Sequence, residues 1–305
     1  MEVIERKGIG HPDTIADVLG EEFGNLLKEE YKKEYGKIMH YNVDKVLVAC
    51  GQVNYKTNKF NSPVNIVFAG NATKLKNNIY ISLMEKTINK VLQPEIDSGL
   101  KYKIYNFLSY CSTDLTENFD LKKCNDTSFA VGFKLNEQEK LIQKIGIYID
   151  NLYKNNKDIG RDNKIMYIGG KYYIALAFKC PIVCGIYFKR KLEIIDKLSK
   201  KFKIDKNNIY INSADTLNEQ FITLTGTSME QGDAGMTGRG NRRNGLITPM
   251  KPMTMEAYYG KNNVTHIGRI YQDKAQIIAN KENKNILLVN HIGGNINKPI
   301  KVYIK

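Results

Sequence analysis

The sequence predicts an α+β protein, in which helices and strands follow one another along 305 residues. Two observations lead to this class. Apolar residues recur at intervals of three and four over several long stretches, as in amphipathic helices, and shorter β-branched runs between them have the pattern of strands. Hydrophobic residues make up 42% of the chain and aromatic residues 10%, which is typical of a folded globular protein.

Four stretches have helical periodicity. The first covers residues 12–31, where Pro12 suits a first helical turn and Asp13 complements the positive end of the helix dipole. The second covers residues 83–92 and is expected to end before Pro94, because proline disrupts a helix interior. The remaining two helices are predicted over residues 137–152 and 188–202.

Short apolar and β-branched runs predict the strands. Gly169 and Gly170 separate two of these runs and have the composition of a tight hairpin turn. The predicted strands cover residues 46–51, 65–70, 104–108, 129–133, 165–168, 172–178, 208–211 and 221–225.

The formal net charge of +14 raises the question of a nucleic-acid partner. The excess consists mostly of lysines spread among asparagine, isoleucine and tyrosine, whereas arginine, the better reader of base edges, is scarce. This distribution indicates a compositional bias, so we expect no nucleic-acid partner. A basic RNA-binding module remains an alternative because the chain has 19 tyrosines that could stack on bases.

Cysteine usage and hydropathy indicate a compartment. The five cysteines are odd in number, lack the spacing of metal ligands and are expected to be buried free thiols, which suits a reducing environment. No run reaches the roughly 20 apolar residues of a membrane span, and the N-terminus lacks the apolar core of a signal peptide. We therefore expect a cytoplasmic protein without a membrane partner.

The most informative stretch is the glycine-rich segment 226–245. Its glycines allow positive φ angles and close approach of backbone N–H groups to a ligand. Arg239, Arg242 and Arg243 are threaded among them, with Asp233 nearby. Guanidinium groups match phosphate oxygens, so the segment has the chemistry of a polyphosphate site, with a flexible basic loop as the alternative. Further cations follow within residues 260–269.

These stretches resemble the S-adenosylmethionine synthetase (methionine adenosyltransferase) family, in its archaeal-type branch. The matching motifs occur in family order along nearly the whole chain. They are Gly10-His11-Pro12-Asp13, Asn125-Asp126-Thr127-Ser128-Phe129, Gly226-Thr227-Ser228, Gly238-Arg239-Gly240-Asn241-Arg242, Asn244-Gly245-Leu246-Ile247-Thr248-Pro249, Pro252-Met253-Thr254-Met255-Glu256-Ala257 and Gly260-Lys261-Asn262.

The resemblance implies a reaction in which the sulfur of methionine attacks C5′ of ATP and expels the triphosphate, which is then hydrolysed to pyrophosphate and phosphate. It assigns catalytic roles to His11, Lys164, Arg239 and Lys261. Arg242, His266, Arg269 and Asp233 are assigned to the ATP and triphosphate site, Asp126 to the methionine ammonium, and Asp13 to Mg²⁺. A requirement for K⁺ is left open.

The family fold implies three pseudo-repeated lobes of strand, helix and hairpin within one catalytic unit, approximately residues 1–115, 116–215 and 216–305. It also implies a homodimer with active sites at the interface. This chain departs from the family pattern at Phe60-Asn61-Ser62-Pro63, where a glycine turn is usual, and at Asn71, where an arginine is usual. The alternative is therefore a divergent paralog that binds ATP or an adenosyl ligand without synthesis.

Overall fold

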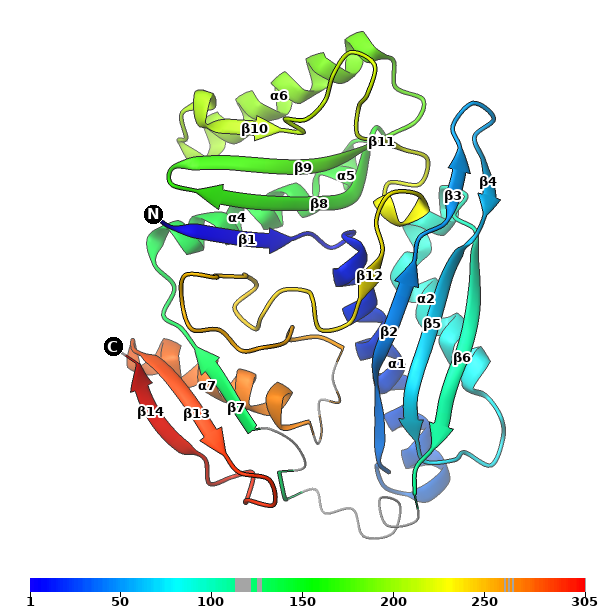
Figure 1. Cartoon of the computed structure of the whole chain (residues 1–305), viewed down its shortest axis with the longest axis vertical. Coiled ribbons are helices and arrows are strands. Elements are labelled where there is room, and N and C mark those ends of the chain that lie inside the picture. Colours follow the sequence, from blue (N-terminus) through cyan, green and yellow to red (C-terminus); the bar gives the residue numbers. More distant parts are fainter. Residues whose placement is uncertain (113–121, 125–127, 261, 263, 265, 305) are drawn as a thin grey trace.

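A computed structural model describes residues 1–112, 122–124, 128–260, 262, 264 and 266–304. It confirms the α+β class. The described residues form three sheets with helices packed against them, and a separate two-stranded hairpin (Figure 1).

The first sheet has the strand order β12-β2-β5-β6 and lies at the right of Figure 1. β2 and β5 are antiparallel, whereas β5 and β6 are parallel and joined by helix α2. The elements are α1 (Pro12–Tyr35), β2 (Tyr41–Ala49), β5 (Val64–Ala72), α2 (Tyr80–Asp97), β6 (Tyr102–Tyr110) and β12 (Gly235–Met236).

The second sheet repeats this topology with the order β1-β8-β9-β10, and β11 also pairs with β9. β8 and β9 form an antiparallel hairpin around Gly169 and Gly170, which both have positive φ, and α6 leads to β10 parallel to β9. The elements are β1 (Val3–Lys7), α4 (Glu137–Asp150), α5 (Leu152–Asn155), β8 (Ile159–Ile168), β9 (Lys171–Lys179), α6 (Cys184–Phe202), β10 (Ile209–Ile211) and β11 (Ile222–Thr223). In both sheets a helix, two antiparallel strands, a second helix and a parallel strand follow in this order, so the two sheets are pseudo-repeats.

The third sheet is smaller, with the order β14-β13-β7 and helix α7 against it. Its elements are β7 (Ser128–Gly132), α7 (Ile267–Glu282), β13 (Asn285–Asn290) and β14 (Ile300–Ile304). The separate hairpin consists of β3 (Gln52–Asn54) and β4 (Lys59–Ser62), and short 3-10 helices cover Lys206–Asn208 and Ser228–Glu230.

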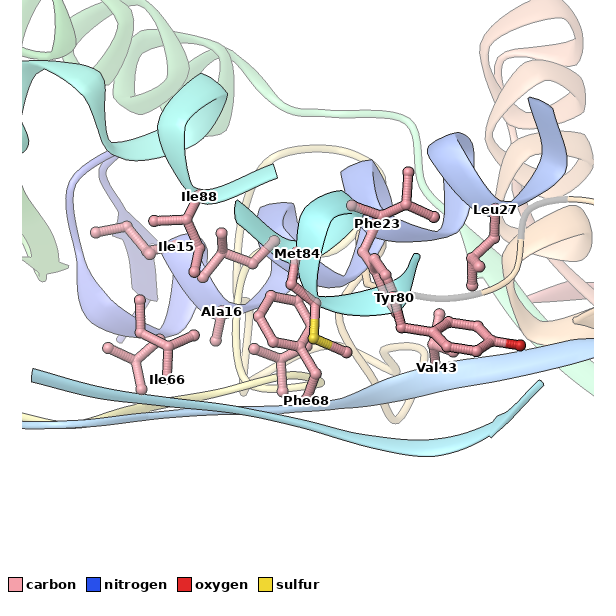
Figure 2. Close-up of a cluster of buried hydrophobic side chains, with 14 of the residues drawn as sticks. Ile15, Ala16, Phe23, Leu27, Val43, Ile66, Phe68, Tyr80, Met84 and Ile88 are labelled. Atoms are coloured by element: carbon pink, nitrogen blue, oxygen red, sulfur yellow. The ribbon is translucent and has the colours of Figure 1, made fainter. Parts of the chain in front are cut away.

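Each sheet has its own apolar core. In the first, α1 and α2 pack side chains onto one face of β2 and β5, as Figure 2 shows for Phe23, Met84 and Phe68. The rings of Phe23 and Phe68 meet edge to face with centroids 5.2 Å apart. This core anchors α1, whose N-terminus carries the His11-Pro12-Asp13 motif.

The segment after β11 connects the three sheets (Figure 1). Its β12 pairs with β2 in the first sheet, and Ile247 bridges to Glu5 of β1 in the second. Thr254 Oγ1 accepts a hydrogen bond from Val131 N of β7 in the third. Residues 235–254, which include the second half of the glycine-rich segment, are therefore held between the three sheets rather than forming a free loop.

Several expectations were wrong in detail. Helix α2 continues through Pro94 because Leu92 departs from helical geometry (φ −109°, ψ 15°) and takes up the resulting bend. The predicted strand 221–225 is reduced to β11, and β1, β13, β14 and α7 were not expected. All five cysteines are free, as predicted, but of these only Cys124 is buried.

Within the described parts of the chain, no helix is both long and apolar enough to cross a membrane.

Candidate active site

His11 is the N-cap residue of α1. Its ring Nδ1 accepts a hydrogen bond from the backbone N–H of Asp13 at 3.2 Å, so the neutral ring carries its proton on Nε2. Burial lowers the pKa of His11 to about 4; the charges of Lys7, Lys164 and Arg239 lower it too, while Asp13 opposes them. At neutral pH, His11 is therefore an uncharged N–H donor beside three cations.

Asp13 is buried in the first turn of α1. Its Oδ2 accepts a hydrogen bond from Lys7 Nζ at 2.7 Å, and its Oδ1 accepts one from the backbone N–H of Met236 at 3.0 Å. Burial acts to raise the pKa of the Asp13 carboxyl, but the hydrogen bonds from Lys7 and Met236 and the charge of Lys7 lower it overall. Asp13 is therefore a carboxylate in this site.

Asp17 lies one helical turn further along α1, on the same buried side. Its two carboxylate oxygens accept hydrogen bonds from Gly238 N at 2.7 Å and Gly240 N at 3.0 Å, the amides on either side of Arg239. A Cβ at Gly240 would lie 2.1 Å from Asp17 Oδ2, so this close approach requires glycine. Asp17 thus fixes the backbone that carries Arg239. Sequence reasoning missed it, although its spacing of four from Asp13 was an available signal.

The side chains of Arg239 and Asp233 extend from the glycine-rich segment toward His11 and Asp13, and we call this place the His11 corner. Arg239 is 65% exposed, with its Nε 4.0 Å from Asp13 Oδ1. Asp233 is 49% exposed, with its Oδ2 3.9 Å from His11 Nε2. Both side chains are accessible to a ligand that contacts His11. Lys7 Nζ donates at 2.7 Å to the Arg239 carbonyl oxygen and so fixes the backbone at Arg239.

Lys164 projects from β8 and its Nζ lies 3.2 Å from Glu5 Oε2. With Tyr173 and Phe221, among others, it lines a cavity of about 390 Å³. This cavity is large enough for a small planar ligand, and the lysine places a positive charge at its edge.

Asp162 lies two residues before Lys164 on the same strand and is buried. It accepts hydrogen bonds from Ser228 N at 2.9 Å and Ser228 Oγ at 2.6 Å. Burial raises the pKa of Asp162 to about 7, although the Ser228 hydrogen bonds oppose that shift. Sequence reasoning passed over Asp162, and the β8 register shifts between Ile159 and Asn163, so no regular strand period pointed to it.

Arg242 and Arg269 already have partners within the chain. Arg242 donates to the carbonyl oxygens of Thr254, Gly240 and Met255 at 3.0, 3.1 and 2.8 Å. Arg269 is buried on α7, with both terminal nitrogens 3.1 to 3.2 Å from the Glu21 carboxylate. Arg242 therefore ties the glycine-rich segment to residues 254–255, and Arg269 ties α7 to α1.

Three expected residues remain, namely His266, Lys261 and Asp126. His266 is the N-cap residue of α7 and makes no side-chain capping bond there. Lys261 and Asp126 lie outside the described residues. The structure therefore brings together His11, Asp13, Arg239, Asp233 and Lys164, with Lys7, Asp17 and Asp162 as additions.

A divalent cation can be tested against this arrangement. Among the residues that the structure describes, no cluster of three or more histidine, cysteine, aspartate or glutamate side chains is arranged to hold a metal ion. Asp13 and Asp233 nevertheless border the same histidine and supply hard carboxylate oxygens. One or two carboxylates fit Mg²⁺, which in proteins typically keeps water and phosphate oxygens as its other ligands.

In this α+β protein, cations, a neutral histidine donor and carboxylates lie around a glycine-rich segment. These features define a class of proteins suited to polyphosphate ligands. Comparison with known proteins is more specific. A family model described as S-adenosylmethionine synthetase (AdoMet synthetase) matches residues 1–305. The chain belongs to the S-adenosylmethionine synthetase family.

Individual relatives agree with this assignment. The chain is 34% identical over 340 residues to the probable S-adenosylmethionine synthase of Aquifex aeolicus and 36% identical over 335 residues to the S-adenosylmethionine synthase of Methanoregula boonei. Each match covers 98% of this chain and 84% of the relative. A solved structure of an unusual S-adenosylmethionine synthetase from Campylobacter jejuni has the same fold, with a TM-score of 0.62, 16% identity, and coverage of 97% of this chain and 78% of that one.

Proposed function

We propose that this protein is a methionine adenosyltransferase, which converts ATP, L-methionine and water to S-adenosylmethionine, pyrophosphate and phosphate. Family membership supports the reaction class. The observation that carries the proposal for this chain is the corner at which His11, a neutral N–H donor, meets Lys7, Lys164 and Arg239. That arrangement suits a leaving group with several negative charges.

In the proposed reaction, a lone pair on the methionine sulfur forms the new bond to C5′ of the ribose. The C5′–O bond breaks and its electron pair leaves with the triphosphate. A thioether has no proton to lose, so no general base is required. The protein's contribution is electrostatic: His11 Nε2–H donates to a triphosphate oxygen, while Arg239 and Lys164 balance the developing charge.

The same corner supports a role for a metal ion. We expect Asp13, with Asp233, to hold Mg²⁺ together with phosphate oxygens, and K⁺ is a candidate second ion. Bound Mg²⁺ would neutralise phosphate charge in both the substitution and the hydrolysis of triphosphate. Lys261 and Asp126 are expected to complete the triphosphate and methionine sites, and the cavity beside Lys164 and Phe221 suits the adenosine group. Arg242, Arg269 and His266 remain predicted phosphate ligands. In the structure, Arg242 donates to backbone carbonyl oxygens and Arg269 pairs with Glu21.

We further propose a homodimer with the active sites at its interface. Helices α1 and α2 cover one face of the first sheet. On this sheet Leu47 and Met236, which are cross-strand partners, are 39% and 47% exposed. An exposed apolar pair on a sheet surface is suited to a second subunit. Light scattering tests this proposal by measuring the molar mass of each protein. We expect the wild type to be a dimer and Leu47→Lys to be a monomer.

Product analysis tests the activity. Purified protein is incubated with ATP, methionine and Mg²⁺ while S-adenosylmethionine and phosphate are followed together. Formation of both, abolished in His11→Ala, is the expected result. Phosphate alone would identify a triphosphate or ATP hydrolase on the same scaffold. Neither product, with ATP still bound, would favour the divergent paralog.

A further inference from the structure

The β3–β4 hairpin projects past the end of the first sheet and lies beside the start of the glycine-rich segment (Figure 1). Three hydrogen bonds attach its N-terminal side to the turn at residues 229–231. Gly51 N donates to Met229 O at 2.9 Å, Val53 N donates to Gln231 Oε1 at 3.0 Å, and Tyr55 OH donates to Glu230 Oε1 at 3.0 Å.

Glu230 is the centre of this attachment and is completely buried. Besides Tyr55, its carboxylate accepts hydrogen bonds from Leu224 N at 2.5 Å and from both N and Oγ1 of Thr225 at 2.6 Å. Four donors around one carboxylate are what a buried charge requires. The arrangement joins β11, the 229–231 turn and the hairpin through a single side chain.

The turn that Glu230 stabilises also touches the candidate active site. Thr227 Oγ1 donates to Gly10 O at 3.1 Å, directly before His11, and Ser228 is held by Asp162. Asp233 follows Glu230 after only two intervening residues. A shift of the turn would therefore move the loop relative to the end of α1.

We propose that Glu230 is a positioning residue of the active site, and that Tyr55 and Glu230 form a latch that holds the 52–62 hairpin against the glycine-rich segment. Neither side chain belongs to the His11 corner, and Glu230 acts through the loop that carries Asp233 and Arg239. The kinetic consequence of this proposal rests on the proposed synthetase activity. The structural coupling between hairpin and loop does not.

Kinetics of Tyr55→Phe, Glu230→Gln and the double variant test the positioning role. We expect kcat to fall about 5-fold in Tyr55→Phe and about 30-fold in Glu230→Gln, because the loop loses its fixed geometry. In the double variant, Tyr55→Phe should add no further loss, because the hydroxyl that it removes acts on the loop through its hydrogen bond to Glu230. Thr57→Val, which removes a hydrogen bond within the same hairpin, is the matched control and should retain kcat. If the fold-losses in kcat of the two single variants multiply in the double variant, the latch proposal is wrong.

Trypsin cleavage after the exposed Lys56 and Lys59 provides a readout that needs no activity. Release of the hairpin should increase the initial cleavage rate at least 3-fold in Tyr55→Phe, with no change in Thr57→Val. An unchanged rate in Tyr55→Phe would overturn the latch even if kcat fell. If the wild type makes no S-adenosylmethionine, the proposed function fails while the cleavage rates still decide whether the latch exists.

Discussion

His11 gives the most quantitative prediction. Burial and the charges of Lys7, Lys164 and Arg239 lower its pKa from 6.5 to about 4, which corresponds to about 3 kcal/mol against protonation. A bound polyphosphate would place negative charge among the same cations and reverse the local potential. One anionic charge about 5 Å from the ring is worth roughly 3 kcal/mol at an effective dielectric constant near 20, so the pKa of His11 should rise by about two.

NMR titration of the histidine ring protons measures both values. The chain has four histidines, so the His11 signal is identified by its loss in His11→Asn. We expect its pKa to be near 4 in the free protein and near 6 with tripolyphosphate in the absence of Mg²⁺. A His11 pKa near 6.5 in the free protein, or one that tripolyphosphate leaves unchanged, would refute the reasoning.

Three further predictions concern Asp17 and Asp162 beside the site and Arg269 on α7. Asp17→Asn should lower kcat about 10-fold or more with little change in the KM for methionine, because it frees the amides that flank Arg239; an unchanged kcat in a steady-state assay would contradict this. Because the pKa of Asp162 is raised in the folded protein, its protonated carboxyl contributes up to roughly 4 kcal/mol to the free energy of unfolding. This contribution is complete below about pH 4 and is lost as the pH rises to about 7. Denaturant titrations at pH 4 to 8 should therefore show a smaller decline of stability with pH in Asp162→Asn than in the wild type, and parallel curves would contradict the assignment. Arg269→Met should destabilise the fold by about 3 kcal/mol because it removes the guanidinium that pairs with the buried Glu21 carboxylate, and a melting temperature within 1–2 °C of the wild type, measured by calorimetry, would exclude that role.

The helices and the hairpin that the sequence predicted share a clear local signal. The apolar period of α1, the capped start of α4 and the Gly169-Gly170 turn do not depend on distant partners. Helix α7 lacked such a signal because its buried side includes Arg269, Gln272 and Gln276, polar residues that interrupt the apolar period. Strand β1 exists through pairing with β8, more than 150 residues away, which no local pattern reveals.

The same distinction applies to the site. His11 and Asp13 are adjacent to a helix start and could be predicted together from chemistry and family resemblance. The roles of Asp17 and Asp162 depend on which backbone amides fold against them, and only the tertiary structure supplies that information. Arg269 was predicted as a phosphate ligand from its charge and motif position. Its Glu21 partner lies 248 residues earlier, so the ion pair could not be inferred from the sequence.

Binding of tripolyphosphate, measured by calorimetry, tests the central claim that the His11 corner is the triphosphate site. Arg239→Ala should weaken binding at least 30-fold, whereas Arg243→Ala, which removes a nearby arginine paired with Asp273, should change it less than 3-fold. That contrast would support the site as described. Equal affinity of the wild type and Arg239→Ala, or a larger loss in Arg243→Ala, would contradict it.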